Sequence, residues 1–156
     1  MPQFSNRRRV HHAAGDMFDL VSDIGKYPEF VPMCSAMHLR NRRENEDGSF
    51  EVVATMTVAY KMIRQSFTSR ARCDKAKLKI LVEYLDGPFR HLRNRWAFHP
   101  TGEHACEVEF YIDYEFRSRA LQLLMGAMFD AAFRRFAVAF EERADMVYGR
   151  HRRASR

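Results

Sequence analysis

The sequence predicts an α+β domain in which a curved antiparallel sheet wraps around one long C-terminal helix. Five segments between residues 50 and 116 alternate apolar and polar side chains, which is the period of a half-buried strand. Residues 118–148 then change to a helical period with no internal proline. The front half of that helix is apolar nearly all round, so we expect it to contact the sheet and something else besides.

The first 32 residues predict a strand and two short helices. Residues 4–12 alternate and form the first strand. A helical pattern opens at residues 13–16 and ends at Gly25, a residue common at helix ends. Residues 26–32 contain two prolines, which limit the segment, and they predict a second helical turn.

The antiparallel strands follow in order. Residues 35–44 and 50–60 form a hairpin, because Asn45-Glu46-Asp47-Gly48 between them is a strong turn signal. The strands expected after this hairpin span residues 63–73, 77–85, 92–99 and 106–116. If residues 100–104 form the last hairpin turn, Arg95 lies opposite Glu109, and Asp113 faces solvent.

Composition bounds the class of protein. The chain has 156 residues, which suits a single domain, expected over residues 1–149, and residues 150–156 predict a disordered basic tail. The three cysteines have long spacings and no CxxC motif, so we expect buried, reduced thiols. We find no membrane-spanning run and no secretory h-region, so we expect a cytoplasmic location.

No catalytic or metal site is predicted. The seven histidines are scattered, without HExxH or zinc-ligand spacing, and no GxSxG, P-loop or GxGxxG motif occurs. Catalysis requires groups with tuned proton affinity that converge in a pocket, and the apolar face of the sheet shows no such convergence. We therefore expect a protein that is not an enzyme and that holds no metal.

Four blocks of the sequence resemble the coenzyme Q-binding START-domain family, within the polyketide cyclase/START-like superfamily. They are YPEFVPMC (27–34), GPFRHL (87–92) followed by Trp96 and Phe98, VEFYIDYEF (108–116) and FEERA (140–144). The resemblance implies a helix-grip fold with a hydrophobic tunnel that binds ubiquinone or a related polyprenyl lipid in support of respiratory electron transfer. Arg93 departs from the acidic residue expected in many relatives, and makes the tunnel mouth more basic.

The expected tunnel lies between the inner face of the sheet and the final helix. We expect its lining to be Met56, Val58, Phe67, Val82, Tyr84, Trp96, Phe98, Phe110, Ile112, Leu121, Met125, Met128 and Phe129. At its mouth we expect an apolar lip that touches a membrane or closes over the ligand, formed by Phe30, Val31, Pro88, Phe89 and His91. From the pattern alone, Trp96 as a core plug and Phe89 as a loop anchor are the simpler interpretations.

Two other functions stay open. The net charge of +6, with Arg7–Arg9, the arginines at 40, 42 and 43, and the basic tail, suits a ribosome-binding protein, since some bacterial relatives in the superfamily are ribosome-association toxins. The same charges suit a peripheral position on an anionic membrane, such as the inner face of a respiratory membrane. A polyketide cyclase-like enzyme rests on fold analogy alone. The apolar face of residues 121–136 serves a dimer as easily as a ligand, so the oligomeric state stays open.

Overall fold

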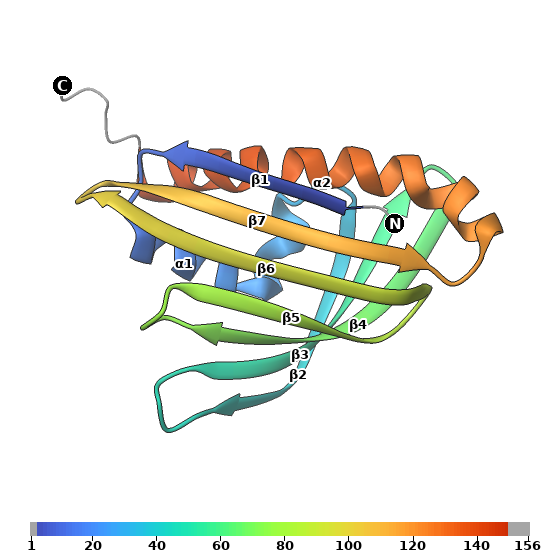
Figure 1. The fold of residues 1–156 in the computed structure, drawn as a ribbon, viewed down its shortest axis with the longest axis horizontal. Coiled ribbons are helices and arrows are strands. Elements are labelled where there is room, and N and C mark those ends of the chain that lie inside the picture. The colour runs from blue at the N-terminus through green and yellow to red at the C-terminus, as the bar shows by residue number, and fades with distance from the viewer. Residues whose placement is uncertain (1–2, 150–156) are drawn as a thin grey trace.

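One antiparallel sheet of seven strands forms the body of the protein in a computed structural model that describes residues 3–149. The strands are β1 (Gln3–Val10), β2 (Cys34–Glu44), β3 (Phe50–Tyr60), β4 (Ile63–Asp74), β5 (Lys79–Asp86), β6 (Phe89–Gly102) and β7 (Ala105–Phe116). Their order across the sheet is β1-β7-β6-β5-β4-β3-β2. Every strand therefore pairs with a neighbour in the chain, except that β1 is joined to β7 (Figure 1).

Three helices complete the fold: α1 (Ala14–Ser22), the 3₁₀ helix η1 (Ile24–Glu29) and α2 (Arg119–Tyr148). The sheet curves around α2, which lies along its concave side (Figure 1). The predicted helix-grip arrangement, with two short helices after the first strand, is confirmed. The predicted basic tail lies outside the described residues.

Local chemistry sets the limits of α2. The Ser118 side chain accepts a hydrogen bond from the backbone N–H of Leu121 at 3.2 Å, which caps the first turn. Gly149 ends the helix with φ of 79°, a conformation that glycine adopts without steric cost. Between these ends, α2 packs Phe133 against Tyr114 and Phe140 against Trp96, with ring centroids 5.4 and 5.1 Å apart.

The predicted pairing of Arg95 with Glu109 is wrong by two residues. Arg95 lies opposite Tyr111, and its guanidinium carbon lies 4.2 Å from the centroid of that ring. The cause is the hairpin turn, which falls on Glu103-His104 because β6 continues as a strand through Pro100 to Gly102.

Asp113 also departs from the sequence prediction. Only 9% of the residue is exposed, although it lies on the outer face of the sheet. The Tyr111 hydroxyl donates a hydrogen bond to one of its carboxylate oxygens at 2.5 Å, and His91 Nε2 lies 3.0 Å from the other. These neighbours on β6 and β7 cover the carboxylate that we expected to face solvent.

Candidate functional site

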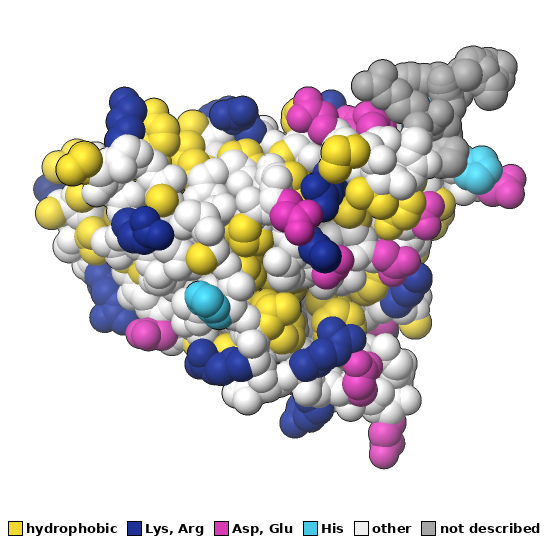
Figure 2. Space-filling model, turned by 180° about the vertical axis from the view of Figure 1, so that it is seen from behind, with side chains coloured by type: hydrophobic (Ala, Val, Ile, Leu, Met, Phe, Trp, Pro, Cys, Tyr) yellow, Lys and Arg dark blue, Asp and Glu magenta, His cyan; other side chains and the backbone are white. Residues whose placement is uncertain are grey.

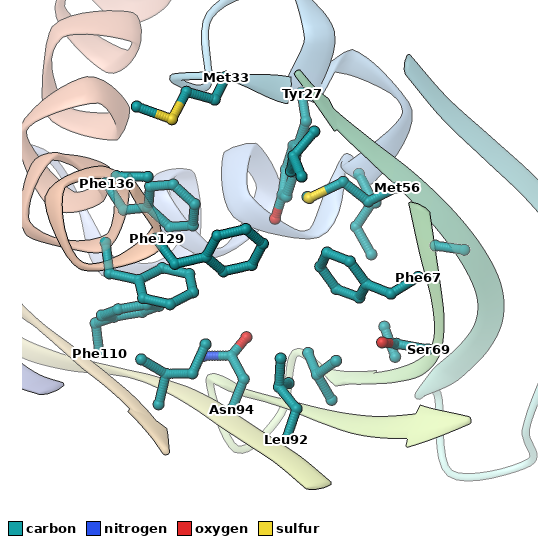
Figure 3. A pocket seen from close by; sticks show the side chains of 18 of the residues that line it. Tyr27, Met33, Met56, Phe67, Ser69, Leu92, Asn94, Phe110, Phe129 and Phe136 are labelled. Atoms are coloured by element: carbon teal, nitrogen blue, oxygen red, sulfur yellow. The ribbon is translucent and has the colours of Figure 1, made fainter. Parts of the chain in front are cut away.

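A cavity of about 110 Å³ lies between the concave face of the sheet, η1 and α2 (Figure 3). Its lining residues are Ile24, Tyr27, Pro32, Met33, Met37, Ala54, Met56, Val58, Phe67, Ser69, Ala71, Ile80, Val82, Leu92, Asn94, Trp96, Phe110, Ile112, Met128, Phe129, Ala132, Phe133, Phe136 and Phe140. No Lys, Arg, His, Asp or Glu is among them. The site is thus an apolar chamber with a few neutral polar groups.

Most of the expected wall residues lie in this lining. They are Met56, Val58, Phe67, Val82, Trp96, Phe110, Ile112, Met128 and Phe129. They belong to the inner rows of β3 to β7 and to one face of α2, where alternation and helical period place them.

Four expected wall residues lie elsewhere. Phe98 packs edge-on against Phe18 of α1, with ring centroids 6.0 Å apart, and Met125 is fully enclosed within the core. The Tyr84 hydroxyl accepts a hydrogen bond from the backbone N–H of Phe89 at 3.0 Å. Leu121 is half-buried in the first turn of α2. All four support the fold around the cavity and none of them lines it.

The region around η1 supplies cavity residues that sequence reasoning missed. Tyr27, Pro32, Met33 and Met37 come from η1, the turn after it and the start of β2. A 3₁₀ helix and a turn have no hydrophobic period long enough to assign an inward face, so no signal marked Tyr27, Pro32 and Met33 as lining. Met37 lies in β2, a strand for which no inward face was predicted.

Three polar side chains point into the cavity. In Figure 3 the oxygens of Ser69 and Asn94 face it from the sheet, and the Tyr27 hydroxyl faces it from η1. Tyr27 donates a hydrogen bond to the Val21 carbonyl at 2.5 Å, and burial is the main cause of its raised pKa. The tyrosine is therefore neutral at physiological pH. These neutral groups are the polar part of an otherwise apolar lining.

The predicted lip at Pro88 and Phe89 is wrong. Phe89 has an exposed fraction of 0% and Pro88 is also buried. Gly87 has φ of 147°, and a Cβ there would lie 2.6 Å from the Cβ of Phe67. The chain thus turns inward at a glycine that packs its backbone against β4, and the phenylalanine enters the core as an anchor.

Phe89 lies at the centre of an aromatic cluster. Its ring stacks on Phe116 at 4.8 Å between centroids and meets four other rings edge-on. Those rings, at centroid distances of 5.4 to 5.8 Å, belong to Phe67, Tyr84, Tyr114 and Phe129. The cluster joins β4, β5, β6, β7 and α2 at one end of the fold.

The other expected lip residues are also drawn into the structure. Val31 is buried, and Phe30 meets the Phe140 ring edge-on at 5.0 Å, so Val31 and Phe30 pack against the core. Arg143 lies over the Phe30 ring and forms an ion pair with Glu29. His91 is held by Asp113 on the outer face of the sheet, away from the cavity lining.

The two most exposed large apolar side chains lie at a different place. Met62 is 97% exposed in the hairpin between β3 and β4, and Leu123 is 85% exposed in the first turns of α2. Both segments lie at the same end of the long axis in Figure 1. Figure 2 shows this end at the left, with hydrophobic side chains among Lys and Arg. Apolar groups with cations nearby are the chemistry that contacts an anionic membrane surface.

The three cysteine thiols are buried and are not activated. Burial raises the pKa of the Cys34 and Cys106 thiols to about 11 and that of Cys73 to about 12, so all three are protonated and weakly nucleophilic at neutral pH. Within residues 3–149, no group of three or more His, Cys, Asp or Glu side chains could hold a metal ion.

Several arginines that suggested RNA binding form ion pairs within the chain. Arg7 contacts Glu107 at 2.7 Å and Arg8 contacts Glu141 at 2.6 Å. On the outer face, a hollow of about 620 Å³ lies over β4, β5 and β6. The arginines that line this hollow are Arg70, Arg72, Arg90, Arg93 and Arg95. Glu51 and Glu83 also line the hollow and form ion pairs with Arg72 and Arg70, and Arg90 contacts Glu115. The hollow therefore carries charges of both signs with an excess of arginines, on the opposite side of the sheet from the cavity.

A curved sheet closed by a C-terminal helix around an apolar chamber defines a START-like protein of the helix-grip class. The family model described as "Polyketide cyclase / dehydrase and lipid transport" matches residues 10–141. The chain belongs to this family.

Two curated relatives carry different names. "Ribosome association toxin RatA" of Vibrio cholerae is 35% identical over 149 residues, which cover 96% of this chain and 99% of that protein. "Coenzyme Q-binding protein COQ10 homolog B, mitochondrial" of Xenopus laevis is 28% identical and is matched over 95% of this chain and 60% of its own length. The chain is thus similar to a protein named for a lipid and to proteins named for the ribosome.

Solved structures share the fold. The solution structure of an 18 kDa protein from Caulobacter crescentus is 33% identical, with a TM-score of 0.78 and coverage of 96% of this chain and 100% of the other. An aromatase/cyclase from a Streptomyces species has a TM-score of 0.75 at 18% identity, with coverage of 99% and 97%, which shows the fold alone. None of the helices within residues 3–149 is long and apolar enough to cross a membrane.

Proposed function

We propose that this protein binds ubiquinone or a related polyprenyl lipid without catalysing a reaction, and carries or presents it in support of respiratory electron transfer. The observation that supports the proposal most directly is the apolar chamber enclosed by the sheet, η1 and α2. The chain is also 28% identical to a relative named for coenzyme Q binding. The proposed role needs no acid or base, and the described lining contains no carboxylate, imidazole or amine.

The size of the cavity bears on how such a lipid binds. Ligand pockets usually measure roughly 300–1,000 Å³, and an apolar cavity of about 150 Å³ holds benzene. The volume of about 110 Å³ therefore matches one ring and not a long tail. Four methionines line the cavity, and their flexible thioethers can change rotamer as a ligand enters. These methionines are Met33, Met37, Met56 and Met128.

Apolar contact supplies the affinity. Each five-carbon unit that leaves water contributes on the order of a few kcal/mol at about 25 cal/mol per Å² of buried apolar area. The cost of ordering the chain reduces this gain. The lipid ring then occupies the cavity, and the tail follows the path that the rearranged methionines open.

A matched pair of helix variants tests the proposal. Ala132 is buried and lines the cavity, whereas the adjacent Ala131 is exposed on α2. Organic extraction of purified protein followed by mass spectrometry should recover a quinone from the wild type and from Ala131→Leu. Ala132→Leu should recover much less, because the added side chain occupies the cavity. Equal recovery from both variants, or no lipid in any sample, would count against the proposal.

Contact with a membrane completes this proposal. We place it at the end that exposes Met62 and Leu123, where Lys61, Arg64 and Arg119 are also exposed. Each cation near an anionic surface contributes about 1 kcal/mol. Flotation with vesicles that contain acidic lipid should carry the protein upward, and neutral vesicles should carry less.

Ribosome association is the second candidate function. It is favoured by the relatives named for it and by the hollow on the outer face that five arginines line. Cosedimentation with ribosomal subunits should weaken steeply as salt rises, because phosphate contacts release counterions. Arg93→Glu should abolish cosedimentation, whereas Arg134→Glu should not, since Arg134 lies on α2 and is paired with Asp130. Lack of any cosedimentation at low salt would exclude this candidate.

A further inference from the structure

We propose that the cavity selects ligands whose polar end is an uncharged hydroxyl or carbonyl group, and rejects ligands that end in a carboxylate or a phosphate. This inference rests on the proposed lipid binding and deepens it, because it assigns the polar end of the ligand to Ser69 and Asn94. Three observations carry it: an unsatisfied hydroxyl, an oriented amide and a lining without charge.

Ser69 supplies the unsatisfied hydroxyl. The residue lies on the inner row of β4, is 6% exposed, and its Oγ has no hydrogen-bond partner. Its neighbours Ala54 on β3 and Phe67 and Ala71 on β4 offer no side-chain acceptor. Its partner on β5 is Tyr84, whose hydroxyl accepts a hydrogen bond from the Phe89 N–H and makes none with Ser69. Buried polar groups in folded proteins are nearly always hydrogen-bonded, so an orphan that faces a cavity indicates a missing partner. A ligand oxygen placed there would accept the bond.

Asn94 supplies the oriented amide. Its Nδ2 donates a hydrogen bond to the Tyr111 carbonyl at 2.8 Å. A carbonyl can only accept, so this contact fixes which end of the amide faces β7. The side-chain oxygen consequently points into the cavity, as Figure 3 shows. That oxygen can accept a hydrogen bond from a ligand hydroxyl.

The absence of charge decides against ionic ligands. None of the described lining residues is cationic, and the nearby Arg93 and Arg95 are exposed because alternation along β6 places them on the outer face. A carboxylate or phosphate inside the cavity would lose its water without gaining a counter-charge. The cost of such burial far exceeds that of burying a neutral hydroxyl with one hydrogen bond.

The placement of the two groups also bears on ligand shape. Asn94 pairs with Val82 of β5, and Val82 pairs with Ala71 of β4. Ser69 lies two residues from Ala71 along β4, so two strand spacings and two residues along the strand, roughly 12 Å in all, separate the backbones that carry the two side chains. One hydroxyl reaches one of these positions, whereas a ring with oxygens on opposite sides approaches both.

The test compares probes of one chain length. Dodecane, dodecanol and dodecanoate at pH 8 differ in the polar end and in its charge. Trp96 lines the cavity and is the only tryptophan of the chain, so its fluorescence reports occupancy. The wild type should bind dodecanol at least roughly tenfold more tightly than dodecanoate.

Variants assign the selectivity to the named groups. Ser69→Ala combined with Asn94→Leu should weaken dodecanol binding by roughly two- to tenfold, the worth of the one hydrogen bond that a single hydroxyl can form, and leave dodecane binding unchanged. Ser66→Ala is the matched control, because that hydroxyl faces away from the cavity and contacts Thr57. Ser69→Ala should also raise the melting temperature of the ligand-free protein, because it removes an unsatisfied buried group.

The outcomes separate the two proposals. If the three probes bind equally, or dodecanoate binds most tightly, lipid binding stands and the proposed selectivity is wrong. If no probe changes the fluorescence or binds by native mass spectrometry, the lipid-binding proposal itself is wrong and the selectivity goes with it. A variant with both Ser69→Ala and Asn94→Leu that binds dodecanol like the wild type overturns the role of these two groups.

Discussion

Replacing Phe89 with alanine tests whether this residue is a core anchor or a surface lip. The side chain is completely buried and contacts five other aromatic rings. Truncation of a buried phenylalanine usually costs about 3–5 kcal/mol, through lost burial and the cavity that remains. Since a domain is stabilised by only about 5–15 kcal/mol in total, Phe89→Ala should remove a large part of the stability.

The assay is urea unfolding followed by the fluorescence of Trp96, with thermal unfolding beside it. A loss of about 3–5 kcal/mol lowers the melting temperature by roughly 6–20 °C for a chain of this length. Phe89→Leu should lose less, because it keeps most of the apolar volume. Met62→Ala is the control, since that side chain is almost fully exposed and its loss should change stability by less than about 0.5 kcal/mol. A Phe89→Ala variant that loses less than about 1 kcal/mol would refute the packing described above.

Three further predictions concern the backbone, the thiols and the exposed end. Gly87→Ala should destabilise the fold by more than about 1 kcal/mol in urea unfolding, and Gly48→Ala should cost less, since both glycines have positive φ but only Gly87 has close neighbours. The raised thiol pKa values, up to about 12 for Cys73, mean that the folded state holds these protons more tightly than the unfolded state. Their contribution to stability is thus complete below pH 9 and is lost as the pH rises toward 12. The urea concentration at half-unfolding should therefore decrease when the pH is raised from 8 to 10.5. It should decrease less in a variant with all three cysteines replaced by alanine. Met62→Ser combined with Leu123→Ser should reduce flotation with acidic vesicles severalfold and leave the melting temperature unchanged; undiminished flotation would place membrane contact elsewhere.

The sequence predicts the strands and α2 well because their hydrophobic periods are long. Prediction from the sequence fails where a single residue determines the direction of the chain. The Gly87-Pro88 pair signals a turn, but only the contact between Gly87 and Phe67 shows that the chain turns inward, so that Phe89 is buried. The last hairpin shifts because a strand continues through Pro100, which is usually a turn residue.

The cavity was predictable to the extent that it is built from regular elements. Inner-row residues such as Met56 and Trp96 line it as alternation predicts. Met33 was missed because it lies in an irregular turn. Asn94 and Ser69 fell on inner rows, but only the three-dimensional arrangement shows that one is oriented by Tyr111 and the other lacks a partner.

The pairing of β1 with β7 has a consequence for synthesis on the ribosome. β1 leaves the exit tunnel first, yet its partner strand emerges about a hundred residues later, with Gln3 opposite Asp113. The contacts of Arg8 with Glu141 and of His12 with Asp145 each span 133 residues. Domains whose contacts are so distant in sequence fold slowly, and the inner face of the sheet stays uncovered until α2 is complete. A nascent chain stalled before α2 would therefore expose this face to chaperones and to aggregation.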